Sequence, residues 1–433
     1  MKWYRKLHWQ IIIGLVLGLL WGVVSALAGF NEFTSDFIKP IGTIFIKLLK
    51  LIAVPLVLVS LIAGVTSLND ITKLSKIGGK TIIIYMITTV FAISIGLIAV
   101  NVIQPGKSLP EQTKIDLQET YQDNLSGSEE GVAALKDRGP LEFFVNIVPE
   151  NFIEAASDNS KMLQIVLVAL LLGIGIMKVG GEEAKVLINF FDAFNDVIIK
   201  IVDLIMITAP YAVFALMASV IVDLAGDDLN KAIDLLKALG WYCITVVLAL
   251  TIHVFLVYSS MFKISSGYKL KTFFKAIQPA MVLGFSTSSS AATLPVTLER
   301  VEKNLGVDEE VASFVLPVGA TINMDGTSLY QAVAAVFIAQ ALGMDLTILQ
   351  QLTIVITATA ASIGAAGVPG AGIIMLVVVL EAINVPVAGI ALILGVDRIL
   401  DMVRTMVNVT GDAAVALTVA SSEGKLGAPE LDD

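Results

Sequence analysis

The sequence predicts an all-α membrane protein whose helices cross the bilayer several times. Of its 433 residues, 56% are hydrophobic and 15% are charged, whereas soluble domains carry about 25% charged residues. The hydrophobic residues gather in runs of about 18 or more, the length that spans roughly 30 Å of hydrocarbon. Because such runs recur along the chain, we expect the first to be a membrane helix rather than a removable signal.

The connections between the first six predicted helices alternate in charge. These helices are expected at about 10–28, 37–67, 80–103, 141–178, 187–224 and 231–262. Lysine and arginine cluster before the first helix and after the second, fourth and sixth, whereas the other connections are acidic. The positive-inside rule therefore places both termini in the cytoplasm and the protein in the cell (inner) membrane. The net charge of −10 resides largely in outside loops and the tail, and it indicates no nucleic-acid partner.

Two later hydrophobic segments are interrupted in the middle. The first contains five hydroxyl residues in the run "STSSS", and the second is broken by "GAAGVPGAG" at 364–372. Backbone at such breaks must lie against protein or water, because lipid cannot pair with it. We expect two re-entrant helical hairpins that enter from opposite sides, each followed by a full span, at about 310–342 and 386–420. The predicted fold thus has eight transmembrane helices and two hairpins arranged as inverted repeats, a pattern that marks transporter binding sites.

Polar residues form a stripe on the last predicted helix. At 100° per residue, five of them fall within about 80° of arc, with Thr405 beside them. The five are Asp397, Asp401, Arg404, Asn408 and Asp412. Each charge costs about 2.5–3.5 kcal/mol at the centre of a membrane helix, and packing alone would use small residues instead. The stripe therefore predicts a binding site, although Asp397 taken singly is equally well explained as a structural partner of an arginine.

The residue types of the stripe suggest its ligands. The guanidinium of Arg404 can grip a carboxylate with two hydrogen bonds, and Asp401 can hold an ammonium group. Asn408 and Asp412 supply the hard oxygen atoms that alkali cations prefer. A second oxygen-rich break, "GATINMDGTSLY" at 319–330, offers unwound carbonyls to a cation, but Asp-Gly is also common in plain turns.

Four segments in order resemble the dicarboxylate/amino acid:cation symporter family, and the resemblance covers nearly the whole chain. They are "FSTSSSAATLP" (285–295), "GATINMDGT" (319–327), "ASIGAAGVPGAG" (361–372) and "DMVRTMVNVTGD" (401–412). The resemblance implies a homotrimer in which a transport domain moves like an elevator and the hairpin tips act as gates. It assigns residues 1–77 and 141–228 to a scaffold, 78–106 and 229–433 to the transport domain, and 107–140 to an extracellular loop.

The resemblance also implies site residues. Arg404 would bind the side-chain carboxylate of an acidic amino acid and Asp401 its amino group. The other substrate-binding residues would be Ser288, Ser289, Ser290, Thr327, Val368, Gly372, Thr405 and Asn408. A first sodium ion would use Gly319, Asn323, Asn408 and Asp412, a second Thr321, Ser362, Ile363 and Ala365, and a third Tyr85, Thr88, Thr89, Asn323 and Asp325. No organic cofactor is expected.

One departure from the family pattern concerns an arginine. The archaeal aspartate transporter of the family carries an arginine where this chain has Ser288. Arg398 could serve instead, but it lies off the centre of the stripe. Ala365 replaces a threonine of that transporter, which matters little if the ligand is the backbone carbonyl.

Comparison within the family favours a sodium-coupled symporter for aspartate or glutamate. Neutral amino-acid relatives lose the arginine at 404, dicarboxylate relatives the aspartate at 401, and proton-coupled relatives tend to lose the carboxylate at 412; this chain keeps all three. The alternatives are a proton-coupled glutamate symporter or a C4-dicarboxylate symporter of the same family. More distant are an anion channel and an intramembrane aspartyl protease whose Asp325 and Asp401 would share a proton. We expect a transporter and not an enzyme.

Overall fold

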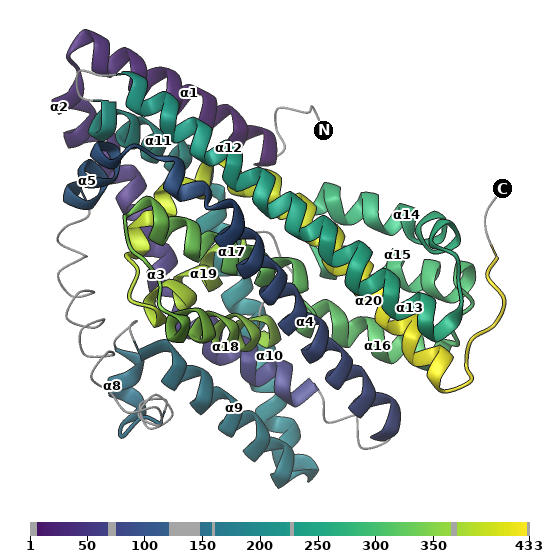
Figure 1. The fold of residues 1–433 in the computed structure, drawn as a ribbon. Coiled ribbons are helices and arrows are strands. Elements are labelled where there is room, and N and C mark those ends of the chain that lie inside the picture. Colours follow the sequence, from purple (N-terminus) through teal and green to yellow (C-terminus); the bar gives the residue numbers. More distant parts are fainter. Residues whose placement is uncertain are drawn as a thin grey trace.

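The regular structure of the described chain is helical. The computed structural model describes residues 7–67, 75–120, 148–157, 161–225, 229–364 and 370–430. Within these ranges every regular element is a helix, and one isolated antiparallel bridge joins Val307 to Leu426. Figure 1 shows the helices packed along and across one another around the last helix, α20. The prediction of a helical protein with several apolar helices is confirmed.

The N-terminal helices follow the predicted positions closely. They are α1 (Leu7–Ala28), α2 (Asn31–Phe33), the π-helix η2 (Thr34–Ile38), α3 (Lys39–Ser67) and α4 (Ser75–Ile103). The helix expected to begin at 80 starts five residues earlier. Lys80 then forms an ion pair with Glu423, which ties α4 to the end of α20.

Part of the predicted loop at 107–140 is helical. The short helix η4 (Pro105–Ser108) is followed by α5 (Glu111–Thr120). Leu109, Thr113 and Leu117 are each at most 2% exposed. Their four-residue spacing is helical, but the middle position is a threonine, so the pattern does not stand out as apolar. The prediction of an exposed loop is wrong for this part, and 121–147 lies outside the described residues.

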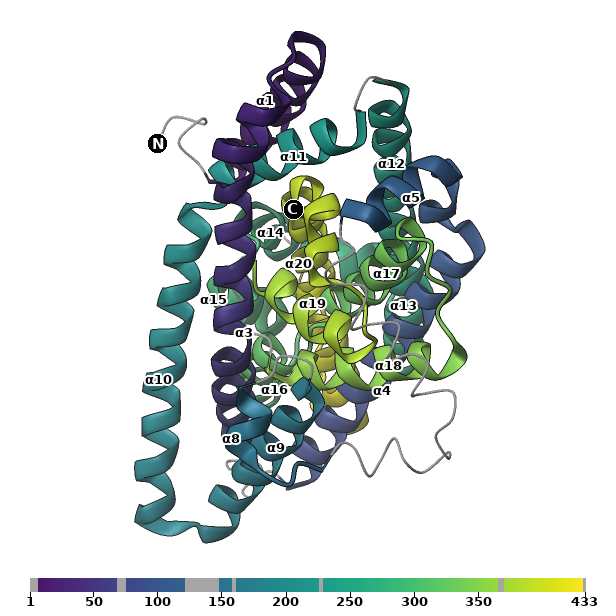
Figure 2. The same ribbon diagram turned by 90° about the vertical axis from the view of Figure 1, so that its left-hand side faces the viewer.

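The predicted helix at 187–224 is two helices. After α8 (Phe152–Ala156) and α9 (Met162–Val179) come α10 (Gly181–Ile207) and α11 (Ala209–Ala225). The last two are bent by 51° at Thr208. Pro210 follows the bend directly, and proline cannot donate the hydrogen bond that a continuous helix needs there. Figure 2 shows α10 as a long helix at one edge of the molecule, with α11 turning away from it.

Helix packing is closest between α1 and α11. Gly14, Gly18 and Gly22 face α11, and a Cβ added at Gly18 would lie 2.5 Å from the carbonyl oxygen of Phe214. Only a residue without a side chain permits this approach. These glycines therefore serve helix packing.

The first expected hairpin is present as a helix–turn–helix. It follows a long span made of α12 (Leu229–Ile252), the π-helix η6 (His253–Tyr258) and α13 (Ser259–Ser266). The hairpin consists of α14 (Leu270–Thr287) and α15 (Ser290–Glu299), followed by η7 (Arg300–Asn304). Ser288 turns the chain with a left-handed φ of 53°. Ser289 then caps α15, because its side chain accepts a hydrogen bond from the amide of Ala292 at 3.1 Å.

The second half repeats this plan. The expected break in "GATINMDGTSLY" separates α16 (Glu309–Ile322) from α17 (Asp325–Ala341). The second helix–turn–helix is α18 (Ile348–Gly364) and α19 (Ala371–Ala382), and its tip at 365–369 lies outside the described residues. The 3₁₀-helix η8 (Val387–Gly389) leads into α20 (Ile390–Ser422). Figure 2 shows α20 in the middle of the molecule among α14, α17 and α19.

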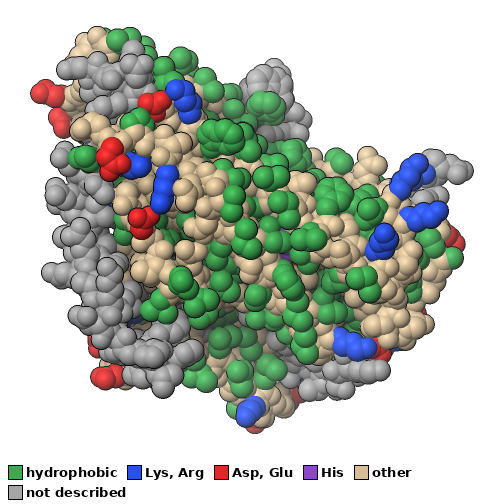
Figure 3. Space-filling view, in the orientation of Figure 1, with side chains coloured by type: hydrophobic (Ala, Val, Ile, Leu, Met, Phe, Trp, Pro, Cys, Tyr) green, Lys and Arg blue, Asp and Glu red, His purple; other side chains and the backbone are tan. Residues whose placement is uncertain are grey.

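Length and apolar composition identify part of the predicted set of spans. Within the described ranges, four helices pass this test, and the bent pair of α10 and α11 makes a fifth candidate. The four lie at Trp9–Ala28, Asn31–Ala63, Ile77–Ser108 and Ile233–Ser266. The predicted spans at 310–342 and 386–420 do not pass this test. The first is broken into two helices, and the second carries the charged stripe. On the face in Figure 3, hydrophobic side chains cover the middle while charged ones gather towards the ends.

We predict that a methyl group at Gly18 destabilises the protein. Gly18→Ala places its Cβ against α11, and overpacking of this kind costs about 1–3 kcal/mol. The midpoint of thermal unfolding in detergent should therefore fall. The matched control is Gly240→Ala on α12, where an added Cβ meets nothing within 4 Å, so the lower entropy of the unfolded chain should leave the midpoint equal or higher. Equal midpoints for the two variants would contradict the close packing of α1 and α11.

Candidate functional site

The polar stripe of α20 faces the interior. Asp397, Asp401, Arg404, Asn408 and Asp412 are each at most 6% exposed. Helix α20 packs against α14, α16, α17 and α12 at this depth. The one-sided arrangement expected from helical geometry is therefore present, and within it Arg404 is paired with Asp397 and Asp401.

Arg404 is the centre of the charged part of the site. Its Nη1 lies 2.8 Å from Asp397 Oδ1, and its Nη2 lies 2.8 Å from Asp401 Oδ1. The guanidinium carbon lies 3.7 Å above the centre of the Tyr330 ring. This is a cation–π contact in a desolvated environment, where such contacts are strongest. Asp397 is a structural partner of an arginine, one of the two roles that its sequence position allowed.

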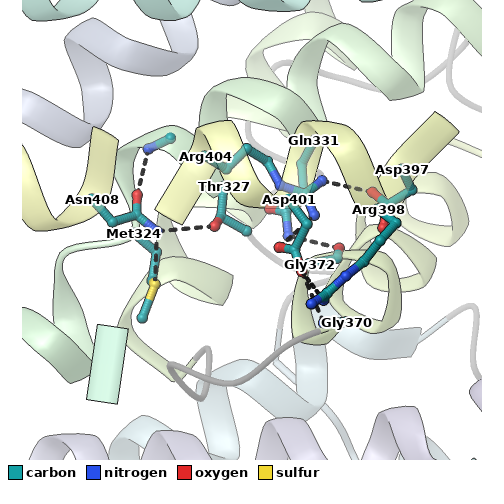
Figure 4. Close-up of polar contacts among 11 residues, drawn as sticks. Met324, Thr327, Gln331, Gly370, Gly372, Asp397, Arg398, Asp401, Arg404 and Asn408 are labelled. Carbon is teal, nitrogen blue, oxygen red and sulfur yellow. Dashed lines mark hydrogen bonds and ion pairs between the residues drawn. The ribbon is translucent and has the colours of Figure 1, made fainter. Parts of the chain in front are cut away.

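Asp401 also contacts Arg398 and the second hairpin. Its Oδ2 lies 3.3 Å from Arg398 Nη1 and accepts a hydrogen bond from the Gly370 amide at 3.3 Å. Figure 4 shows the Arg398 guanidinium between Asp401 and Gly370. The angular position of Arg398 on the helix, off the centre of the stripe, left the direction of its side chain open. Its long side chain reaches back to Asp401, and the three-residue spacing of the two was the available signal.

The amide side chain of Asn408 joins α20 to the start of α17. Its Oδ1 accepts a hydrogen bond from the Gly326 amide at 2.8 Å, and its Nδ2 donates to Thr327 Oγ1 at 3.3 Å (Figure 4). Its Nδ2 also lies 3.2 Å from the sulfur of Met324. The structure thus brings together Asn408 and Thr327, as the resemblance implied.

The start of α19 lies against Arg404. A Cβ at Gly372 would lie 3.2 Å from Arg404 Nη2 and 3.2 Å from Thr327 Cγ2. Gln331 on α17 donates from Nε2 to the Gly372 carbonyl at 3.2 Å. Sequence reasoning did not select Gln331 or Tyr330. Tyr330 and Gln331 lie three and four residues after Thr327, on the same face of a helix, and this spacing was the only sequence signal that they belong to the site.

The serines of the first hairpin form its tip. Ser288, Ser289 and Ser290 are each at most 8% exposed. Ser288 Oγ is buried and has no hydrogen-bond partner within the described ranges. The hairpin approaches α20 through Gly284, where an added Cβ would lie 3.6 Å from Thr405 Cγ2. The predicted substrate residue Val368 lies outside the described residues.

The first predicted cation site is assembled around Asp412. Its Oδ1 accepts a hydrogen bond from Asn323 Nδ2 at 2.8 Å. A Cβ added at Gly319 would lie 2.5 Å from Asp412 Oδ1 and 2.4 Å from the Tyr85 hydroxyl. Gly319, Asn323 and Asp412 therefore lie together, with Tyr85 from the predicted third site beside them. Asn408, also expected here, makes its contacts one turn away.

Residues of the second predicted cation site lie where α18 ends beside the break between α16 and α17. Ser362 Oγ donates to the Ile322 carbonyl at 2.9 Å and accepts from the Met324 amide at 3.2 Å. Thr321 is the next-to-last residue of α16, and its hydroxyl donates to the Val318 carbonyl within that helix. Ile363 belongs to α18, whereas Ala365 lies outside the described residues.

The third predicted cation site centres on Asp325. Its Oδ1 accepts a hydrogen bond from Thr89 Oγ1 at 2.6 Å, and its Oδ2 accepts one from the Tyr258 hydroxyl at 2.8 Å. His253 Nε2 lies 3.2 Å from the same Oδ2. Thr88, also predicted here, bonds to the backbone of its own helix instead.

Sequence reasoning missed His253 and Tyr258 as partners of Asp325. Both belong to the π-helix η6, whose extra residue per turn shifts the side chains off the usual α-helical face. The contacts of Asp325 also bear on the protease hypothesis. Asp325 and Asp401 bind different partners in different parts of the site, which does not support a shared proton.

The donor set suits a hard cation. Within the described ranges, no group of three or more histidine, cysteine, aspartate or glutamate side chains could hold a metal ion. The atoms gathered here are backbone carbonyls, hydroxyls, amides and single carboxylates. Such oxygen atoms favour alkali or alkaline-earth ions over transition metals.

Broken helices around buried charged residues are typical of the binding sites of helical membrane transporters. The chain belongs to the sodium:dicarboxylate symporter family, whose model matches residues 7–422. It is 36% identical over 420 residues to a proton/sodium-glutamate symport protein of Geobacillus stearothermophilus, covering 97% of this chain and 95% of that protein.

Two further relatives show the range of the family. The chain is 37% identical over 456 residues to excitatory amino acid transporter 3 of Mus musculus, covering 95% of this chain and 85% of that protein. It is 33% identical over 426 residues to a C4-dicarboxylate transport protein of Bacillus subtilis, covering 98% and 95% of the two chains. The relatives thus include carriers named for glutamate and for dicarboxylates.

We predict that Asp397 stabilises the protein through Arg404. Asp397→Asn removes a charged acceptor from a guanidinium that is 0% exposed, and such hydrogen bonds contribute about 1.5–3 kcal/mol. Thermal unfolding of the purified protein without substrate should show a lower midpoint. The matched control is Asp196→Asn on α10, where the side chain is exposed. A midpoint as high as that of the control would contradict a structural role for Asp397.

Proposed function

We propose that this protein is a sodium-coupled secondary active symporter for acidic amino acids, aspartate or glutamate. The observation that carries the proposal is the pairing of Arg404 and Asp401 on α20, together with the buried carboxylates of Asp412 and Asp325 at the break between α16 and α17. One cationic and one anionic group in a buried site match a ligand that has both a carboxylate and an ammonium group.

Substrate binding would replace ion pairs within the protein by ion pairs between the protein and the substrate. In the structure, the two oxygen atoms of Asp401 are engaged by Arg404 and Arg398. A substrate carboxylate can take one donor edge of Arg404, while the substrate ammonium takes Asp401. Because buried charges are tolerated only when compensated, such an exchange keeps the site neutralised throughout. Ser290, Thr405 and Asn408 would hold the main carboxylate, with Thr327 and Gly372 assisting.

The cation sites supply the coupling. Asp412 and Asp325 are buried carboxylates whose contacts are amide, hydroxyl and imidazole groups rather than arginine or lysine, as far as the described residues go. A buried carboxylate needs a positive partner. Sodium would meet Asp412, Asn323 and the Gly319 carbonyl at one site, and Asp325, Thr89 and Tyr85 at another. Binding of anionic substrate and binding of cations would then favour one another.

The transport cycle would be an elevator movement in a homotrimer. Residues 1–77 and 141–228 would form the scaffold, in line with the packing of α1 on α11 and of α3 on α9 and α10. Residues 78–106 and 229–433 would form the moving domain, in line with the packing of α4 on α17 and of α14 on α20. The hairpin ends at Ser288 and Gly370 would act as gates. Eight helices would cross the membrane, with both termini in the cytoplasm.

A proton-coupled glutamate symporter is the second candidate, and a C4-dicarboxylate symporter a related one. The observation that favours them is the naming of relatives: one for protons as well as sodium, another for C4-dicarboxylates. Sodium is favoured over protons because each carboxylate lies among further oxygen atoms that a proton does not require. An anion channel would not accumulate substrate against a gradient, whereas a symporter would. We propose no enzymatic activity.

The test is uptake into proteoliposomes. Labelled L-aspartate should accumulate when sodium is present outside only, and not when choline replaces sodium. Asp412→Asn removes a charged cation ligand, so the half-saturating sodium concentration should rise on the order of tenfold, equivalent to about 1.4 kcal/mol.

The exposed Asp196→Asn variant is the control and should leave the sodium titration unchanged. Sodium-independent accumulation driven by an inward proton gradient would replace the proposal by the proton-coupled candidate. An unaltered sodium titration in Asp412→Asn would remove that residue from the cation site.

A further inference from the structure

Arg398 is a buried charge that the proposed substrate contacts do not use. Its side chain is 6% exposed, and its Nη1 lies 3.3 Å from Asp401 Oδ2. Within the described ranges, Asp401 is its one ion-pair partner, and Nε has no hydrogen-bond partner. A buried guanidinium is costly unless it is paired, so its position next to Asp401 calls for a function.

The two arginines hold Asp401 from opposite sides. Arg404 contacts Oδ1 at 2.8 Å, and Arg398 contacts Oδ2 at 3.3 Å (Figure 4). Arg404 is fixed by a second carboxylate, Asp397, and by the ring of Tyr330. Arg398 has the longer contact and no second carboxylate in the described part of the chain. When a substrate ammonium approaches Asp401, Arg398 is therefore the cation that is more easily displaced.

We propose that Arg398 is an internal substitute for the ammonium group of the substrate, and that it admits C4-dicarboxylates, which lack an amine, to the same site. This inference rests on the proposed function. With an amino acid bound, the substrate ammonium replaces Arg398 at Asp401. With a dicarboxylate bound, Arg398 stays and neutralises Asp401. Without Arg398, a dicarboxylate would leave Asp401 buried beside further negative charge, which is strongly unfavourable.

The second hairpin contacts Asp401, the residue at which the cations are exchanged. The Gly370 amide donates to the same Oδ2 that Arg398 contacts. The N-terminal end of α19 thus touches the carboxylate whose partner differs between the two substrate classes.

The experiment compares substrate preference in proteoliposomes under a sodium gradient. It measures KM for labelled L-aspartate and the inhibition constant of unlabelled succinate, for the wild type and for Arg398→Gln, Arg398→Met and Arg398→Lys. In the wild type, succinate should inhibit competitively. In the two neutral variants, the ratio of the succinate inhibition constant to the aspartate KM should rise at least about tenfold, equivalent to about 1.4 kcal/mol. The lysine variant keeps the charge and should stay close to the wild-type ratio.

The matched control is Arg300→Gln, which removes the same charge at η7, where Arg300 donates to Asn304. Its ratio should equal that of the wild type. An unchanged ratio in the neutral variants, or no inhibition of the wild type by succinate, would overturn the inference. Loss of folding in both neutral variants would assign Arg398 to stability alone and would also overturn it. Absence of aspartate uptake by the wild type would instead contradict the proposed function.

Discussion

The structure depends on the compensation of one buried cation. Arg404 is 0% exposed in the interior of an apolar protein, and a lone charge there would not be tolerated. Two aspartates and an aromatic ring satisfy it. The neighbouring helices pack closely around Arg404. Gly326 of α17 lies against the Arg404 carbonyl, and Gly372 of α19 lies against the Arg404 guanidinium. The position of α17 and α19 around α20 is therefore set by the same interaction that makes the site attractive to a carboxylate.

The interrupted helices also help to satisfy buried polar groups. The break between α16 and α17 frees polar backbone groups: the Gly326 amide donates to Asn408, and the Met324 amide donates to Ser362. The side chain of Asn323, at the same break, donates to Asp412. The second hairpin brings Gly370 and Gly372 against Asp401 and Arg404, and the first approaches α20 through Gly284. Unpaired backbone is tolerated in a membrane only in such polar surroundings. Binding groups and helix breaks thus stabilise one another, which explains why they occur together.

Helical geometry predicted the inward-facing stripe, and interruptions of hydrophobic runs predicted both hairpins and the break in "GATINMDGTSLY", because each leaves a local signal in residue type and spacing. Other features leave no such signal. The 51° bend at Thr208 depends on one proline in an otherwise apolar run. The partners of Asp325 lie on a π-helix, which alters the angular position of His253. The direction of the Arg398 side chain could not be predicted, because helical angles place the Cα atom, whereas a long side chain can reach a neighbour three residues away.

Coupling between the buried carboxylates and the substrate site is the central claim, and calorimetry tests it most directly. L-Aspartate is titrated into the purified protein at several sodium concentrations, with ionic strength held constant by choline chloride. Linkage predicts that the dissociation constant falls steadily as sodium rises. A dissociation constant that does not change with sodium would contradict the proposal that Asp412 and Asp325 hold coupling ions.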